Sequence, residues 1–411
     1  MKKLSVLFML ATLVLGGVAT SVAQDDEFLF GVVLVGPKDD HGWSQAHFTA
    51  AEYVEENLPG AKMLLLESLN PADRPETTLD QVVGDMVDQG AKLILTTSAE
   101  FEVDTTEVAK LYPDVVFINV SGDDALWGLA PENAGNFMGQ MEYGKMIAGC
   151  AAALKTQTGS IGYIGPLIDQ ETVRLVNSAY LGARYCYENY RGLDPADLKF
   201  EVTWIGFWFN IPGVTLDPTE VANSFLDGGA DVLISGIDTT EAITVAGQRA
   251  AEGDQVWAIP YDFEGACETA PEICLGVPYF NWGPAYLETV TAVKEGTWEQ
   301  SWDWNPPDWT DINNPDTSAV GFVQGDALTD EEKANLDDFI AKLAAGAQGE
   351  EGGLNLFTGP LNFQDGTPFL AEGQVATEKQ IWFMATNADE ATTPDEVAKP
   401  QLLEGMTGSV E

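Results

Sequence analysis

The segment Lys38–His47, with the sequence KDDHGWSQAH, gathers acidic, imidazole and indole side chains directly after an apolar run, Phe28–Val35. It contains both histidines of the chain, His41 and His47. Three chemistries would use such a set: metal binding by the histidines, acid–base catalysis by an Asp–His pair, or docking of a planar ligand on Trp43.

The spacing of the histidines argues against a metal site. His41 and His47 are six residues apart, which places them on different faces of a helix, whereas zinc-binding helices use an i, i+4 pair. The sequence has no G-x-S-x-G motif, no phosphate-binding loop and no G-x-G-x-x-G motif after the first apolar run. We therefore expect no metal, no cofactor and no enzyme activity, and a secreted hydrolase that uses Asp40 and His41 is the alternative.

Aromatic and acidic side chains follow most of the short apolar runs along the chain. In open parallel sheets, ligands bind beyond the carboxyl ends of the strands, so these side chains are candidates for one shared site. The candidates are Asp40, Trp43, Phe101, Trp208, Asp238, Asp262 and Trp282. Lys38 is the only base close to these positions, whereas a phosphate or carboxylate ligand would need arginine or lysine. The set therefore predicts a neutral or mildly cationic ligand that contains a ring, stacked on aromatic faces and held at its edge by carboxylates.

Several of these residues also have structural interpretations. Asp238 precedes Thr-Thr-Glu and could cap a helix, with Glu241 completing a capping box. Asp40 could be an ordinary loop acid, and each of the three tryptophans could belong to the core. Their common place after strand-like runs favours the ligand-binding interpretation.

The apolar runs alternate with amphipathic segments, which is the pattern of parallel strands joined by crossover helices. Helices are expected over residues 43–58, 78–89, 103–111 and 171–190. Residues 90–123 and 229–263 also resemble one another: each runs from Gly-Ala through a strand, an Asp-Thr-Thr-Glu helix and a second strand to an aspartate. This echo predicts an α/β fold with two similar lobes, and chance similarity between two βαβ units is the alternative.

The C-terminal region has a different character. Residues 296–318 form a connection rich in Trp and Pro, and residues 329–346 are expected to be helical from a capping box, Thr329-x-x-Glu332. A hairpin is expected over residues 359–370, with Asp-Gly at its turn. The polar stretch after residue 385 is expected to be a loose acidic tail.

The charge of the chain is strongly acidic, since 19 Lys and Arg stand against 65 Asp and Glu and give a formal net charge of −46. A field of this sign repels nucleic acids and anionic membranes, so neither is an expected partner. It indicates a solvated acidic surface suited to a salty or exposed setting. The length, 411 residues, suits two globular units.

The first residues have the features of an export signal. Lys2 and Lys3 precede an apolar run, Leu4–Leu15, and residues 21–23 (Ser-Val-Ala) supply the small side chains of a cleavage site. The apolar run is short for a spanning helix, and no cysteine follows the expected cut to carry a lipid. We expect a protein that is exported and soluble, in the periplasm or at the cell surface; an uncleaved anchor is the alternative.

Four cysteines fit an oxidising compartment and predict two disulfides. They allow three pairings, of which we favour Cys150 with Cys186 and Cys267 with Cys274. A zinc site is the alternative, although the spacings include no C-x-x-C pair.

Several motifs together resemble the BMP (basic membrane protein) family, the purine nucleoside and nucleobase binders among the substrate-binding proteins of ABC transporters. The similarity runs from about Phe28 to Gly325 and rests on these stretches: VGPKDDHGWSQAH, MEYGKMIAG, GFWFN, SGIDTTEAI, IPYDFEG and FNWGPAYLETVTAVKEGTW. The resemblance implies a type I periplasmic-binding-protein fold: two Rossmann-like lobes with parallel sheets, joined by three hinge crossovers, with the ligand in the cleft between them. The implied partners are a small-molecule ligand and a membrane permease, and we expect a monomer.

The resemblance also implies roles for single residues. Trp43 and Trp208 would stack on the ligand, Asp238 and Asp262 would be its polar partners, and Phe101 and Trp282 would line the cleft. Nucleoside-binding members carry a lysine near the position of Asn281, and its absence here favours a free purine base such as adenine over a nucleoside. Another small solute, such as a flavin or a sugar, is the alternative ligand.

The expected division of the chain follows from the resemblance and the composition. It comprises a signal peptide, 1–23; the first part of lobe 1, 24–135; the first part of lobe 2, 136–260; a return segment of lobe 1, 261–310; the completion of lobe 2 with a C-terminal helix and hairpin, 311–384; and the loose tail, 385–411.

Overall fold

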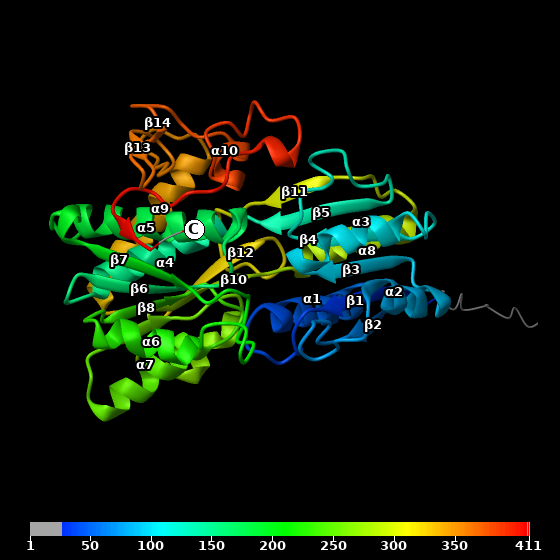
Figure 1. Ribbon diagram of the computed structural model, residues 1–411, viewed down its shortest axis with the longest axis horizontal. Helices are drawn as coiled ribbons and strands as arrows, with labels where there is room; N and C mark the ends of the chain where they lie inside the picture. The colour runs from blue at the N-terminus through cyan, green and yellow to red at the C-terminus, as the bar shows by residue number, and fades with distance from the viewer. Residues whose placement is uncertain (1–26, 409, 411) are drawn as a thin grey trace, which may run out of the picture.

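The computed structural model describes residues 27–408 and residue 410, so the expected signal peptide lies outside the described residues. Two α/β lobes lie side by side along the long axis of the molecule (Figure 1). Each lobe contains a parallel sheet, which confirms the predicted fold class. Within the described residues, no helix combines the length and the apolar character that a membrane crossing requires.

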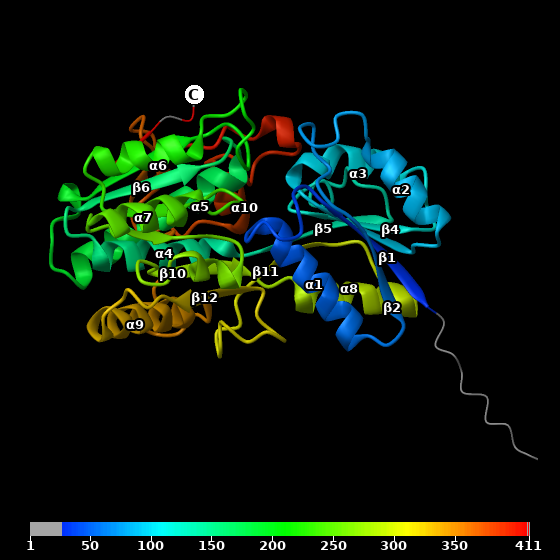
Figure 2. The same ribbon diagram turned by 90° about the horizontal axis from the view of Figure 1, so that it is seen from below.

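Lobe 1 is built on a six-stranded sheet with the strand order β11-β5-β4-β3-β1-β2. Its strands are β1 (Phe28–Leu34), β2 (Ala61–Leu66), β3 (Leu93–Thr97), β4 (Val116–Val120), β5 (Ala134–Gly139) and β11 (Trp302–Asn305). Its helices are α1 (Trp43–Asn57), α2 (Leu79–Asp88), α3 (Glu102–Ala109) and α8 (Gly283–Glu295). Helices α1 and α8 pack together on one face of the sheet, and α2 and α3 pack on the other (Figure 2). Because both faces are covered, β1 and β3 are buried along nearly their whole length, which explains their apolar sequences.

Lobe 2 is built on a five-stranded parallel sheet with the order β15-β7-β6-β8-β9. Its strands are β6 (Ser160–Gly165), β7 (Lys199–Trp204), β8 (Val232–Ser235), β9 (Trp257–Ile259) and β15 (Met406–Thr407). Its helices are α4 (Met141–Lys155), α5 (Gln170–Asn189), α6 (Pro218–Asp227), α7 (Glu241–Glu252) and α9 (Asp330–Ala347). The units β3–α3–β4 and β8–α7–β9 each join two neighbouring parallel strands, one unit in each lobe, as the internal echo predicts.

An antiparallel pair, β10 (Gly276–Phe280) and β12 (Val320–Gln324), lies beside lobe 2, where Leu275 N–H donates to the carbonyl of Ala258 on β9 at 3.0 Å. The chain passes between the lobes three times, after β5, after β10 and after β11. The segment that returns to lobe 1 was expected to begin at residue 261. It begins with α8 instead, because β10 still pairs with β12 beside lobe 2.

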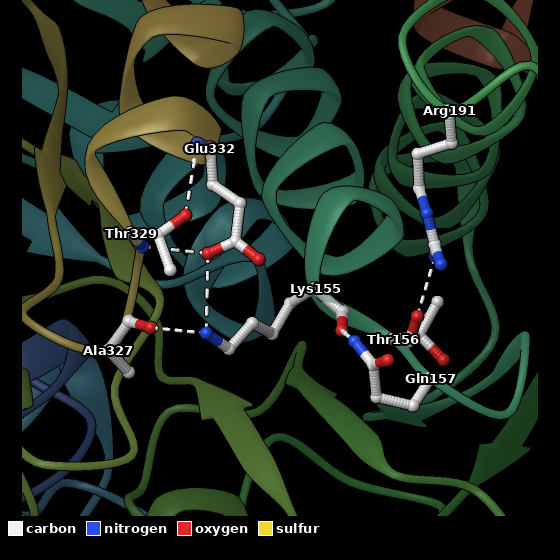
Figure 3. Close-up of polar contacts among 7 residues, drawn as sticks. All are labelled: Lys155, Thr156, Gln157, Arg191, Ala327, Thr329 and Glu332. Carbon is white, nitrogen blue, oxygen red and sulfur yellow. Dashed lines mark hydrogen bonds and ion pairs between the residues drawn. The ribbon is translucent and has the colours of Figure 1, made fainter.

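Helix α9 begins at the expected capping box, and polar contacts join it to the end of α4 (Figure 3). Thr329 Oγ1 accepts from Glu332 N–H at 3.2 Å, and Glu332 Oε2 accepts from Thr329 N–H at 2.7 Å. The Lys155 ammonium donates to Ala327 O at 2.5 Å and to Glu332 Oε2 at 3.2 Å. On the other side of the same helix end, Arg191 donates to the carbonyl of Thr156 at 2.6 Å.

The chain after α9 is packed, and the prediction of a loose tail from residue 385 is wrong. The expected hairpin forms from β13 (Leu361–Asn362) and β14 (Pro368–Leu370), and a short helix, α10 (Glu378–Phe383), follows it. Residues Leu402, Leu403 and Met406 are buried in the core of lobe 2, and β15 pairs with β7. A few apolar residues spaced along a polar segment thus anchor it, because a neighbouring sheet edge and core accept them.

The structure contains two disulfides, Cys150–Cys186 and Cys267–Cys274, which confirms the favoured pairing. The first joins α4 to α5, and these helices approach closely because Gly149 faces the backbone of α5: a Cβ on it would come to 1.8 Å from Ala179 O. The second closes the short loop that contains a 3₁₀ helix, Glu264–Thr269.

Candidate functional site

The loop before α1 is organised by Asp40. Its carboxylate accepts backbone N–H bonds from Gly42 at 2.9 Å, Ser44 at 3.0 Å and Gln45 at 2.9 Å, and so caps the N-terminal turn of α1. Among the described residues, the Asp40 carboxylate makes no hydrogen bond to the His41 ring, which weakens the hydrolase interpretation that pairs the two residues. The opening segment therefore serves first to start α1 at Trp43.

Eight residues from the two lobes line one narrow cavity. Lobe 1 contributes Trp43, Ser98, Ala99 and Ser121, and lobe 2 contributes Glu171, Trp208, Asp238 and Tyr261. Each of these residues follows the carboxyl end of a parallel strand, from β1, β3 and β4 in lobe 1 and from β6, β7, β8 and β9 in lobe 2. The carboxyl ends of the two sheets thus meet at this cavity, as the placement of ligands in open parallel sheets predicts.

The Trp43 ring is held in place from behind. Its Nε1 donates to the carbonyl of Thr97 at 2.7 Å. His47, Phe280 and Trp282 meet it edge to face, at ring-centroid distances of 4.6, 5.4 and 5.6 Å. Such packing fixes the orientation of the ring at the cavity wall.

Burial governs the charge of the carboxyl groups at the site. It raises the pKa of Asp238 well above the ordinary value, and the neighbouring Asp262 adds to the shift. It also raises the pKa of Asp262, with Lys145 acting in the opposite direction. Burial raises the pKa of Glu171 to about 7, against the influence of Arg174. Carboxyl groups of this kind can hold protons near neutral pH and can donate as well as accept hydrogen bonds.

Lys145 is a buried lysine near the site that was not among the expected site residues. Its Nζ donates to the carbonyl of Ser235 at 2.7 Å and lies 3.1 Å from the ring centroid of Tyr261, which lines the cavity. Burial lowers the pKa of this ammonium well below the ordinary value. The expectation that Lys38 is the only base nearby is therefore wrong, because α4 brings Lys145 behind the cavity wall.

Three of the predicted site residues line the cavity, namely Trp43, Trp208 and Asp238. Asp238 is not the N-cap of α7, since Thr240 occupies that position. Phe101 lines a separate hollow with Leu69 and Phe207.

The remaining predicted residues lie behind these walls. Trp282 is buried and stacks on His47 at 4.7 Å, so it supports Trp43. Asp262 is fully buried, and its carboxyl group contributes to the raised pKa of Asp238. Asn281 donates to the carbonyls of Pro315 and Ser318, at 2.9 and 2.8 Å, and so holds the connection before β12.

The cavity also contains five residues that were not among the expected site residues: Ser98, Ala99, Ser121, Glu171 and Tyr261. Ser98, Ser121 and Tyr261 also follow strands directly, so the rule that selected Trp208 would have found them. Glu171 stands in the first turn of α5, after β6, where an acid also has an ordinary role beside the helix N-terminus.

Comparison with known proteins places the chain in a family. The sequence model described as "ABC transporter substrate-binding protein PnrA-like" (Bmp) matches residues 29–343. A purine-binding protein of Brucella abortus (strain 2308) is 30% identical over 375 residues, which cover 90% of this chain and 94% of that protein. A putative ABC transporter glucose-binding protein of Haloferax volcanii is 29% identical over 272 residues, which cover 66% of this chain and 62% of that protein.

Solved structures of solute-binding proteins share the fold. One from Conexibacter woesei DSM 14684 has a TM-score of 0.56 and 20% identity and covers 78% of this chain and 97% of that one. Another from Aeropyrum pernix K1 has a TM-score of 0.58 and 16% identity and covers 80% of this chain and 83% of that one. Proteins of the matched family act outside the cytoplasm. With a family match that spans both lobes and every residue of the cavity, this chain belongs to the Bmp family of ABC transporter substrate-binding proteins.

Proposed function

We propose that the cavity binds a purine base, adenine-like, and that the protein delivers this base to an ABC permease. The observation that carries the proposal is that Trp43 and Trp208, from opposite lobes, line the same narrow cavity. Stacking of a base on an aromatic side chain contributes about 1–3 kcal/mol, and a planar ring between two lobes links their closure to binding.

The edge of a purine offers N–H donors and ring-nitrogen acceptors, and the cavity has polar groups for both. Asp238 and Glu171 lie on the lobe 2 side, and Ser98 and Ser121 lie on the lobe 1 side. A hydrogen bond from an exocyclic N–H group to a carboxylate contributes about 1.5–3 kcal/mol. A protonated carboxyl group can instead donate to a ring nitrogen.

The engaged Asn281 amide and the acidic charge of the protein favour a free base over a nucleoside or a nucleotide. The Asn281 amide is engaged with Pro315 and Ser318, so it is not available to hold a ribose. Nucleotide phosphates would meet a protein of formal charge −46. The name of the Brucella abortus relative, a purine-binding protein, supports the same ligand class.

Calorimetry with adenine, adenosine and adenosine monophosphate tests this proposal. We expect adenine to bind most tightly and the monophosphate least. Adenosine binding that is more than about tenfold tighter than adenine binding would mean that the ribose is recognised and that the base assignment is wrong. An assay for nucleoside cleavage in the same samples tests the hydrolase alternative, and we expect no turnover.

A sugar is the second candidate ligand, because the Haloferax volcanii relative is named a putative glucose-binding protein. Tryptophan faces and carboxyl groups also suit a sugar ring and its hydroxyls. Glucose and riboflavin therefore belong in the same titration series. Binding of glucose without binding of any purine would replace the proposal with this candidate.

A further inference from the structure

The segment after α9, residues 348–408, is in contact with both lobes, and we name it the C-terminal brace. Its last part is fastened to lobe 2: Asn177 Nδ2 donates to Gln401 O and Asn177 Oδ1 accepts from Leu403 N–H, both at 2.9 Å, and β15 extends the lobe 2 sheet. Figure 1 shows the brace, coloured orange to red, running over lobe 2 toward β11 of lobe 1.

Trp382, on α10 of the brace, makes the contact with lobe 1. Its Nε1 donates to Asp123 Oδ2 at 2.9 Å, and its ring meets Trp302 and Trp304 of β11 edge to face at 4.8 and 5.3 Å. The ring centroid of the adjacent Phe383 lies 5.5 Å from that of Trp127 in lobe 1.

The same tryptophan is also held by lobe 2. The Arg174 guanidinium of α5 lies 4.0 Å from the centroid of the Trp382 ring and donates to the Trp382 carbonyl at 3.3 Å. Trp382 is 2% exposed, so the contacts are shielded from water. One indole therefore ties the two lobes together.

The contact lies beside the ligand cavity. Asp123 follows Ser121 by two residues, and it also accepts from Gln170 of lobe 2 at 3.3 Å. Gln170 in turn precedes Glu171, and both Ser121 and Glu171 line the cavity. A movement that separates the lobes at the cavity would pull Asp123 away from two donors, Gln170 and Trp382.

We propose that Trp382 is a positioning residue for lobe closure: the C-terminal brace uses it to hold Asp123, so that the protein populates the closed arrangement before the ligand arrives. A binding protein whose competent state is already populated loses less of its binding free energy to closure. The brace would in this way raise the affinity without touching the ligand.

Energy transfer between two dyes tests this proposal, with labels on Glu76→Cys of lobe 1 and Val214→Cys of lobe 2, both exposed positions. Trp382→Phe removes the indole N–H and keeps a ring. We expect a closed fraction in the ligand-free protein, a smaller closed fraction in Trp382→Phe, and adenine binding about tenfold weaker in that variant. Trp257→Phe, on β9, is the matched control and should match the unsubstituted protein in both measurements.

Asp123→Ala removes the bond from Trp382 and also the bond from Gln170, so it should lower the closed fraction at least as much as Trp382→Phe. Adding Trp382→Phe to Asp123→Ala should change the closed fraction little further, because the bond from Trp382 is already lost. The proposal is overturned if the ligand-free protein is entirely open, if Trp382→Phe leaves the closed fraction unchanged, or if the two effects are additive. The ligand-free distances need no purine, so a failure of adenine to bind would overturn the proposed function and leave this test intact.

Discussion

The α-carbon of Gly42, at the start of α1 in lobe 1, lies against the backbone carbonyl of Asp238 in lobe 2. A Cβ built on Gly42 would come to 1.7 Å from that oxygen. Because the backbone fixes the position of a Cβ and the oxygen is itself a backbone atom, no side-chain rotation can relieve such an overlap, and the two backbone segments must move apart. Glycine at this position thus permits the two walls of the cavity to close.

Gly42→Ala should keep the lobes apart. We expect the variant to bind adenine at least about tenfold more weakly and to retain a larger radius of gyration at saturating ligand, as measured by calorimetry and small-angle scattering. Gly84→Ala on α2 is the control, since a Cβ there meets only the Tyr112 hydroxyl, at 3.2 Å. Full compaction of Gly42→Ala with the ligand would show that the contact does not limit closure.

Substitution of Trp208 should mainly weaken ligand binding, whereas substitution of Trp282 should mainly lower the stability of the protein. Trp208 lines the cavity, so Trp208→Ala should weaken adenine binding by about tenfold or more. Trp282 is 1% exposed and supports Trp43, so Trp282→Ala should cost about 3–5 kcal/mol of unfolding free energy. Urea unfolding measures the stability of both variants, and calorimetry measures their affinity for adenine. Equal effects of the two substitutions on the affinity would contradict the different roles of Trp208, which lines the cavity, and Trp282, which supports Trp43.

The stability of the protein should fall as the pH rises through the range in which Glu171 ionises. Burial raises its pKa from 4.5 to about 7, so the folded state holds this proton more tightly than the unfolded state, and the free energy of unfolding decreases between those pH values. Between pH 5 and pH 8, the free energy of unfolding of Glu171→Gln should therefore fall by about 2 kcal/mol less than that of the unsubstituted protein. Urea unfolding without ligand measures this, with the exposed Glu351→Gln as control; parallel profiles for Glu171→Gln and the unsubstituted protein would refute the prediction.

Salt should stabilise the protein. The formal charge is −46, and the described residues form six ion pairs, most of them at the surface. Screening reduces the repulsion among the unpaired acids, so we expect the melting temperature to rise by about 5 °C or more between 0.1 and 2 M NaCl. Potassium chloride should act similarly at equal ionic strength. A melting temperature that does not change with salt would show that the acidic surface carries little repulsion.

Both disulfides should be oxidised in the native protein, since the described residues include no free cysteine. Cys150→Ala with Cys186→Ala should cost about 4 kcal/mol, because the bridge closes a loop of 36 residues, and the pair at Cys267 and Cys274, 7 residues apart, should cost about 2.5 kcal/mol. Urea unfolding compares the two. Peptide mapping without reductant is the direct check, and free thiols in native material would refute the prediction.

The sequence by itself determined the fold class and the strand ends at which the cavity forms, and it narrowed the cysteines to three possible pairings, of which the structure shows the favoured one. The periodicity of apolar residues is a local property, and parallel strands align their carboxyl ends, so Trp43, Trp208 and Asp238 could be selected from the sequence. The capping box of α9 and the turn of the hairpin were predictable for the same reason, because neighbouring residues satisfy each other's hydrogen bonds.

Only the tertiary structure decided which candidates reach the cavity. The Asp40 carboxylate accepts hydrogen bonds from backbone amides at the start of α1, and Trp282 packs against the Trp43 ring. Lys145 enters from α4, and the brace is anchored because β7 offers an edge to β15. Each of these outcomes depends on contacts between segments far apart in the chain, and such contacts are set by the packing of whole elements rather than by the pattern within any one of them.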